Sequence, residues 1–379
     1  MHANITRKGS SMWRYIGTLW IYGVLLLALG GCFGSKLAQT PPIEEVEKAQ
    51  DGDILTLSFI GDNILGDYYG SQGETLNWYF AHKINKDYGY FFAEVKEILQ
   101  NDDMTLANLE GPLTTHDKDR LIKPFAFKGD PSYVEILKLG SIEAVNIANN
   151  HTRDYGMQGF KDTQLHLQNA QIHYSGEGIL SIYEIRGKKI GMAGHRGWNL
   201  AIKTQVKNEI EALRNRGADI IIFSFHWGEE RKHYPNGIQK ELGRYAIDCG
   251  ADLVIGHHPH VLQGIEEYKG KKIVYSLGNF VYGGAKNPPD KDSIIYQVRF
   301  AFGAKQSQLK TLSKDTIFIH NQKVQKFATL PKWSELHSFI PVLISGERHK
   351  NNYQPIIAQG EAKRRILERM NTYSASLSQ

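Results

Sequence analysis

The chain has 379 residues, of which 41% are hydrophobic and 22% charged, a composition that is typical of globular proteins and excludes wholesale disorder. Lys and Arg number 45 against 40 Asp and Glu, and three of the cations lie in the first 31 residues, which contain no acid. The remainder is therefore nearly neutral, which argues against a protein that binds nucleic-acid phosphates. The two cysteines, Cys32 and Cys249, exclude a disulfide scaffold and a Cys-rich zinc module.

The amino terminus reads as a targeting segment. An apolar run at residues 15–29 follows a basic segment and ends in Leu29-Gly30-Gly31-Cys32. A secretory signal combines these parts, whereas a spanning helix needs about 20 apolar residues. The tetrapeptide resembles the lipobox of bacterial lipoproteins, which implies a signal peptide at 1–31, acylation of Cys32 and an extracytoplasmic, lipid-anchored protein. An uncleaved membrane anchor with an incidental cysteine is the alternative.

The next segment, residues 32–51, carries a Pro-Pro pair and no apolar periodicity, which predicts a tether. From residue 54 onward short apolar runs alternate with amphipathic stretches. Strands are expected at Ile54–Ile60, Met104–Ala107, Ala144–Ala148, Lys189–Ala193, Asp219–Phe225, Leu253–Ile255 and Lys272–Ser276. Helices are expected at Phe91–Gln100, Ser132–Leu139, Gly159–Asn169, Gln205–Arg216 and Gln239–Asp248. This order predicts an α/β fold.

The pattern changes after about residue 290. Ser293–Phe302 and Asp315–Val324 are predicted to be antiparallel strands, Trp333–Pro355 to be irregular, and Glu361–Tyr373 to be a terminal helix. We therefore expect a main domain over residues 52–330 and a C-terminal extension over 331–379.

Polar side chains follow five of the predicted strands. They are Asp62 after the first, Asn108 and Glu110 after the second, Asn149, Asn150 and His151 after the third, His226 after the fifth, and His257, His258 and His260 after the sixth. Because the carboxyl ends of the strands meet at one edge of an α/β sheet, these residues are expected to converge. Oxygen and nitrogen donors without thiolate suit Mn, Zn or Fe. Taken singly, each residue also fits a turn, a helix cap or a buried core histidine.

Longer segments carry a family resemblance. They are FIGDNILG (59–66), NLEGPLT (108–114), ANNHTRDYGMQGFKDT (148–163), SFHWGEE (224–230), GADLVIGHHPHVLQGIE (250–266) and YSLGNFVYG (275–283). This text resembles the CapA family of capsule-synthesis proteins, which are associated with poly-γ-glutamate and are similar to calcineurin-like metallophosphoesterases. The resemblance covers about residues 54–285. It implies a layered α/β sandwich with its site at the carboxyl ends of the strands.

The resemblance also implies a role for individual residues. The metal ligands would be Asp62, Glu110, Asn150, His226, His258 and His260, holding one or two divalent ions. His151 would be the general acid, with Asp154 either orienting it or capping the next helix. Ile64 stands where a phosphoesterase has a histidine ligand, and His257 stands where it has a glycine. That difference puts a complete two-metal site in doubt.

Two further residues are candidates for substrate binding. Arg153 is placed to recognise phosphate or carboxylate, with a solvated loop arginine as the alternative. Asn279 would approach the same edge of the sheet, with a plain turn at Gly278 as the alternative.

Three functions are consistent with these features. The first is a surface-anchored CapA-type protein in the biosynthesis, export or attachment of an anionic capsule polymer, with a capsule synthase complex as its partner by analogy. The second is an extracytoplasmic metallophosphoesterase that acts on small phosphoesters. The third is a non-catalytic scaffold that binds the polymer.

Overall fold

The computed structural model describes residues 54–302, 316–319 and 339–377. The predicted targeting segment, the tether and Cys32 lie outside these ranges. In the described ranges, no helix has both the length and the apolar character needed to cross a bilayer.

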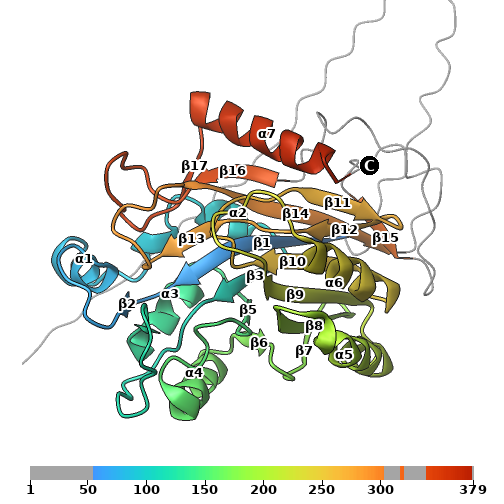
Figure 1. The fold of residues 1–379 in the computed structure, drawn as a ribbon, viewed down its shortest axis with the longest axis horizontal. Helices are drawn as coiled ribbons and strands as arrows, with labels where there is room; N and C mark the ends of the chain where they lie inside the picture. The colour runs from blue at the N-terminus through green and yellow to red at the C-terminus, as the bar shows by residue number, and fades with distance from the viewer. Residues whose placement is uncertain (1–53, 303–315, 320–338, 378–379) are drawn as a thin grey trace, which may run out of the picture. The chain divides into compact units, whose positions relative to one another are not determined.

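Two β-sheets form the centre of the fold (Figure 1). The first sheet has the order β17-β16-β14-β1-β3-β5-β6, with β13 pairing with β1 and β15 with β14. Its strands are β1 (Ile54–Ile64), β3 (Met104–Leu109), β5 (Ala144–Asn146), β6 (His173–Ser175), β13 (Asn279–Tyr282), β14 (Asp292–Phe302), β15 (Thr316–Ile319), β16 (Phe339–Leu343) and β17 (Ile356–Ile357). Strands β13, β1, β3, β5 and β6 are parallel to one another, so their carboxyl ends share one edge.

The second sheet has the order β11-β12-β10-β9-β8-β7. Its strands are β7 (Ser181–Ile185), β8 (Lys188–Gly197), β9 (Ile220–Trp227), β10 (Leu253–His257), β11 (Ile265–Tyr268) and β12 (Lys271–Val274). The four strands β8, β9, β10 and β12 run parallel. Every residue of β9 and β10 is buried, as their nearly unbroken apolar sequences predict for strands covered on both faces.

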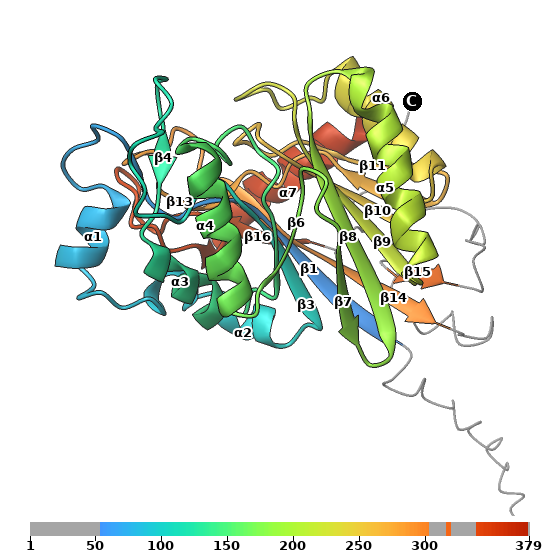
Figure 2. The same ribbon diagram turned by 90° about the horizontal axis from the view of Figure 1, so that it is seen from below.

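Helices cover the outer face of each sheet (Figure 2). On the first sheet lie α1 (Leu76–His82), α2 (Lys96–Gln100), α3 (Val134–Leu139) and α4 (Gly156–Asn169), and on the second lie α5 (Lys203–Asn215) and α6 (Gly237–Asp248). One apolar cluster fills the space between the sheets, for example Leu57 and Leu106 with Ile222 and Ile255. The predicted fold class, a layered α/β sandwich, is confirmed.

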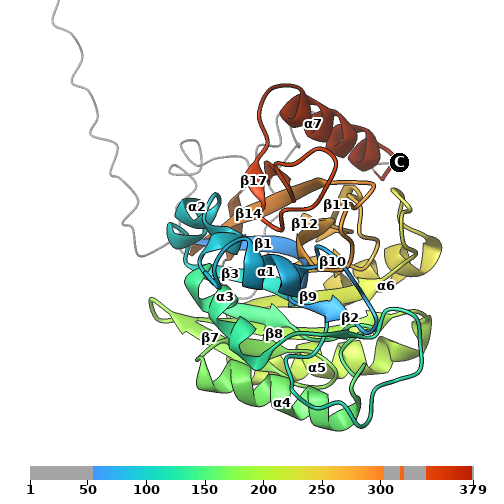
Figure 3. The ribbon, with the colours of Figure 1, turned by 90° about the vertical axis from the view of Figure 1, so that its left-hand side faces the viewer.

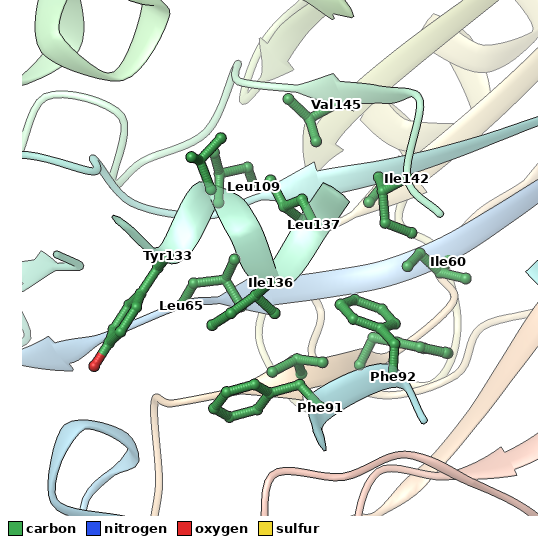
Figure 4. Packing of buried hydrophobic residues seen from close by; sticks show 14 of the residues in the cluster. Ile60, Leu65, Phe91, Phe92, Leu109, Tyr133, Ile136, Leu137, Ile142 and Val145 are labelled. Carbon is green, nitrogen blue, oxygen red and sulfur yellow. The ribbon is translucent and has the colours of Figure 1, made fainter. Parts of the chain in front are cut away.

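A second apolar cluster joins the first sheet to its helices (Figure 4). Ile136 and Leu137 of α3 are fully buried against Ile60 of β1 and Leu109 of β3. Burying one such side chain contributes about 2 kcal/mol. This packing holds the carboxyl ends of β1 and β3 in place, and therefore positions the polar residues at those ends.

The carboxyl-terminal residues complete both sheets. Strand β16 pairs antiparallel with β14, and α7 (Gly360–Ala375) packs on β14 and β16 of the first sheet and on β11 of the second (Figures 1 and 3). Arg365 and Arg369 of α7 form ion pairs with Asp292, which is 4% exposed.

Several sequence predictions need correction. The helix expected at Phe91–Gln100 is a 3-10 turn at Tyr90–Phe92, in which Phe91 and Phe92 are both buried, followed by the short α2. The segment Trp333–Pro355, which was expected to be irregular, contains β16.

The strand predicted at Ser293–Phe302 is confirmed as the antiparallel β14, but β15 pairs with β14 in parallel. The thirteen residues between the two strands are too many for a tight hairpin. Of the strand predicted at Asp315–Val324, only Thr316–Ile319 lies in the described part of the chain.

Candidate metal centre

The carboxyl ends of the parallel strands deliver the predicted ligands to one place between the sheets. Asp62 lies near the end of β1, Glu110 follows β3, Asn150 follows β5, His226 lies in β9, and His258 and His260 follow β10. Strands β9 and β10 align His226 with His257 in register. The convergence expected from the sequence is therefore present, and it joins residues up to about 200 positions apart.

Asp62 is held in place by the backbone around it. A Cβ at Gly61 would lie 2.1 Å from the carbonyl oxygen of Gly278, so only glycine permits this close approach. The approach allows the Asp62 amide to donate to that same oxygen at 3.0 Å. The carboxylate of Asp62 accepts hydrogen bonds from Asn108 Nδ2 at 2.8 Å and from the His258 amide at 3.1 Å. Asp62 is fully buried and rigidly aimed.

Glu110 is the common neighbour of the imidazoles. Its Oε1 lies 3.6 Å from His226 Nε2, 3.7 Å from His260 Nε2 and 3.8 Å from His151 Nε2. The side chain is 1% exposed, and neither carboxylate oxygen has a hydrogen-bond partner within the described residues. Leaving a buried charged group unpaired is costly, so this arrangement indicates a carboxylate kept for a ligand.

The turn after β10 is strained. His258 has φ of 96° and His260 has φ of 56°, both in the left-handed region that side chains rarely adopt. Such strain costs about 1–3 kcal/mol per residue and persists where the surroundings enforce it, which is common at functional sites. Here the left-handed backbone directs the imidazoles of His258 and His260 towards Glu110.

His151 belongs to a second arrangement beside the cluster. Its Nδ1 lies 2.7 Å from Asp154 Oδ2, which also accepts from the Phe127 amide at 2.8 Å. Lys123 Nζ lies 2.5 Å from Asp154 Oδ1 and donates to the Asn150 carbonyl at 3.0 Å. The first residue of α4 is preceded by Tyr155, which makes no side-chain cap, so Asp154 orients His151 and does not cap the helix.

Burial and mutual repulsion set the protonation of the cluster. Burial and the neighbouring His260 lower the pKa of His258 to about 3, and burial lowers the pKa of His226 well below its usual value. Burial opposes protonation of His260, but Glu110 and Asp62 outweigh it and raise its pKa to about 9. Burial raises the pKa of Glu110 well above its usual value. Burial would also raise the pKa of Asp62, but the imidazoles of His257 and His260 hold it well below its usual range.

A cavity of about 430 Å³ opens onto this edge of the sheets. His151, His260 and Asn279 lie at its wall, together with the cations Lys123 and Arg231. The remainder of the wall that concerns the site is aromatic, formed by Phe125, Phe127 and Tyr282. The wall also carries the carboxylates of Glu230 and Asp290, and Lys123 is paired with Asp154, so the cavity has the size of a ligand site and charges of both signs.

The two predicted substrate-binding residues differ in position. Asn279 lies in the cavity wall and its Oδ1 is 2.9 Å from His260 Nδ1, which orients that imidazole. Arg153 is outside the wall, with its guanidinium over the ring of Phe160 and 3.9 Å from Glu177. Neither position tests a contact with substrate.

The structure adds residues that the sequence interpretation did not assign to the site. Glu230 lies with His258 and His260 in one group of candidate metal ligands, and Tyr282 lies in the cavity wall. His257, the residue in the glycine position, is 1% exposed with its Nδ1 3.4 Å from Asp62 Oδ1. Glu230 could have been found from its place in the segment SFHWGEE, four residues after His226.

The donor set fits a divalent metal. The ligand atoms of Glu110, His226 and His258 all lie within 4.8 Å of one another, as do those of Asp62, Glu110 and His260. Asn150 Oδ1 adds an uncharged oxygen 2.7 Å from His226 Nε2. Imidazoles and buried carboxylates are the ligands that Zn²⁺, Mn²⁺ and Fe²⁺ take, and a bound cation would favour the ionised form of Glu110 and the neutral form of His260.

A family model and two similar curated proteins point to bacterial capsule synthesis. Residues 56–283 match the family model described as "Bacterial capsule synthesis protein PGA_cap". The chain is 32% identical over 267 residues to the PGA biosynthesis protein CapA of Bacillus subtilis (strain 168), covering 65% of this chain and 67% of that protein. It is 29% identical over 280 residues to the capsule biosynthesis protein CapA of Bacillus anthracis, covering 66% of each. The matches thus span about two thirds of each relative.

Among solved structures, a hypothetical protein from Thermus thermophilus aligns with a TM-score of 0.40 and 13% sequence identity, over 65% of this chain and 92% of that one.

Proposed function

Because this chain belongs to the PGA_cap family of bacterial capsule synthesis proteins, we propose that it takes part in making or attaching an anionic poly-glutamate capsule. We further propose that it does so through a metal-dependent hydrolytic site. The observation that carries this second step is Glu110, a buried carboxylate without a hydrogen-bond donor among the described residues, surrounded by three imidazoles.

The residues that would hold the metal are Asp62, Glu110, Asn150, His226, His258 and His260. A divalent ion bound there supplies a hydroxide near neutral pH and polarises the bond to be cleaved. The chain itself positions the substrate. Lys123 and Arg231 in the cavity wall would contact anionic groups of the substrate, and the aromatic residues of the wall would contact its apolar parts.

His151 would handle the proton. Since the Asp154 carboxylate accepts from Nδ1, the lone pair of His151 Nε2 points towards Glu110 and the cluster. Burial lowers the pKa of His151, with Asp154 opposing, so the imidazole is uncharged near neutral pH and its Nε2 would take the proton that the attacking water gives up. It can then pass that proton to the leaving atom. A scaffold without catalysis has no use for an oriented imidazole beside a metal cluster, which favours the enzyme.

The location is part of the proposal. We propose that the chain is exported and anchored by acylation of Cys32. Mass spectrometry of the mature chain from wild-type and Cys32→Ser cells tests this. A lipid mass on the wild-type amino terminus that the variant lacks is expected, and an unmodified wild-type terminus would contradict it.

The decisive test of the function combines metal content with capsule formation. The full chain, purified in detergent, should hold a divalent metal by elemental analysis and should cleave γ-glutamyl or phosphoester substrates only when it is loaded. Cells that carry His151→Ala should lose surface polymer while the variant keeps its metal. Wild-type polymer in a His151→Ala, His226→Ala strain would refute the catalytic role and leave a polymer-binding scaffold.

A small-phosphoester hydrolase is the second candidate. Two metals that share a bridging carboxylate suit in-line phosphoryl displacement, and Glu110 is common to two groups of candidate ligands. Turnover of phosphoesters without cleavage of γ-glutamyl substrates would favour this candidate.

A further inference from the structure

The two halves of the candidate metal centre differ in their number of donors. Around His226 there are four, from Glu110, His226, His258 and Asn150. The group around Asp62 has three, from Asp62, Glu110 and His260, and the buried His257 lies beside it with its Nδ1 3.4 Å from Asp62 Oδ1. Residue 64, two positions after Asp62 on the same strand, is an isoleucine, 1% exposed and without a donor atom.

A carboxylate from another element lies next to the poorer half. The carboxylate of Glu230 is within 4.8 Å of the ligand nitrogens of His258 and His260. It therefore shares His258 with the His226 half and His260 with the Asp62 half. Glu230 is exposed and lines the cavity with His260, so it approaches from the solvent side, opposite to the buried Asp62 and Glu110.

The loop that carries Glu230 is tied to the histidine turn. The Arg231 amide donates to the carbonyl oxygen of Pro259 at 2.8 Å, which joins the residue after Glu230 to the residue between His258 and His260. Gly228, with φ of 80°, turns the chain out of β9 just before this point. The position of Glu230 is thus set by backbone contacts.

We propose that Glu230 is a metal ligand that supplies, from the loop after β9, a carboxylate donor beside His258 and His260. The inference rests on the proposed metal site and assigns a residue to it. With Asp62 and Glu110, Glu230 brings three carboxylates to the site, which together balance most of the charge of two divalent ions.

The neighbouring glutamate provides a matched control. Glu229 is equally exposed, but it lines a separate cavity with Lys232, His233 and Tyr234. Removing either side chain changes the net charge by the same amount on the same loop. Only the removal of Glu230 takes away a candidate ligand atom.

The experiment is a titration of the metal-free full chain with Mn²⁺, followed by calorimetry and electron paramagnetic resonance. The wild type and Glu229→Ala should each bind about two ions and give the signal of a coupled pair. Glu230→Ala should keep one ion, bind the second at least about tenfold more weakly and give an isolated-ion signal. Glu230→His, which restores a donor, should recover the second ion.

The outcomes separate this inference from the function beneath it. If Glu230→Ala titrates like Glu229→Ala, with one ion or with two, Glu230 is not a ligand and the metal site stands without it. If the wild type binds no ion, the proposed metal site fails and this inference fails with it.

Discussion

Two buried carboxylates at the ends of strands have opposite surroundings. Asp252, just before β10, is 3% exposed and accepts from Arg214 at 2.9 Å, from the Ile221 amide at 2.9 Å and from Lys271 at 3.0 Å. Glu110, just after β3, is 1% exposed and has no donor among the described residues. Asp252 is therefore a structural group whose charge is satisfied by the fold, whereas the fold leaves Glu110 open for a cation.

The largest expected effect is on metal binding. His258→Ala and Asp62→Asn should each weaken the binding of a metal ion about 100-fold or more, because the first removes a ligand atom from the His226 group and the second removes a ligand charge from the Asp62 group. Elemental analysis and calorimetry measure this. His349→Ala, an exposed histidine, is the control and should bind like the wild type. Equal binding by all three variants would place the metal elsewhere.

The next largest effect is on stability and concerns Asp252, the structural carboxylate. Asp252→Ala should lower the free energy of unfolding by about 3–5 kcal/mol, since it leaves the nearly buried Lys271 without its counter-charge. Chemical denaturation of the metal-free chain measures it. Metal affinity of the folded variant should be unchanged. A loss below about 1 kcal/mol would show that Asp252 and Glu110 do not differ in the way described.

In the metal-free chain, Glu110→Gln should raise the free energy of unfolding, whereas Asp252→Ala should lower it. Burial raises the pKa of Glu110 in the folded state above its unfolded value, so the folded protein loses stability as pH rises through that interval. The amide cannot ionise, and we expect Glu110→Gln to be more stable than the wild type by about 1 kcal/mol or more at about pH 8.

That advantage of Glu110→Gln should shrink as pH falls below the usual carboxyl pKa of about 4.3, where the wild-type carboxyl is protonated in both states. Denaturation in a metal chelator across this range measures it. After metal is added, the wild type should become the more stable of the two, because only it regains the ligand. A variant that is less stable than the metal-free wild type at neutral to mildly alkaline pH would contradict this prediction.

The smallest expected effect concerns Asp102, a carboxylate whose surroundings are intermediate between those of Asp252 and Glu110. Burial raises the pKa of Asp102 to about 7, although Thr105 donates to it at 2.8 Å. Its folded pKa lies above the unfolded one, so the folded protein should lose stability between about pH 4 and about pH 7. Over that interval the free energy of unfolding of Asp102→Asn should therefore rise relative to that of the wild type by about 1 kcal/mol. Below about pH 4 the difference should not change. Parallel unfolding curves at all pH values would show that Asp102 is not perturbed.

The sequence predicted the position of the site better than its surroundings. Polar residues after apolar runs identify strand ends directly, so the convergence of Asp62, Glu110 and His226 followed from the topology of parallel strands. Glu230 was missed because it stands in a loop, where the backbone contact between Arg231 and Pro259 brings it to the histidines. A loop position of this kind leaves no periodic signal in the sequence.

The errors in the fold have a similar origin. Strand β16 was missed because Pro341 lowers its strand propensity, and tertiary pairing with β14 overrides that preference. The end of β1 was placed four residues too early, at Ile60, because its continuation depends on β13, which is far along the chain. Local patterns carry no information about such partners.

The position of β1 in its sheet also has a consequence for how the chain folds. Ile54 pairs with Ala301, and β14 in turn pairs with β16, so the first strand waits for partners that are synthesised almost 250 residues later. Contacts between such distant residues slow folding, because a long loop must close before they form. The sheet therefore completes only when nearly the whole chain is available.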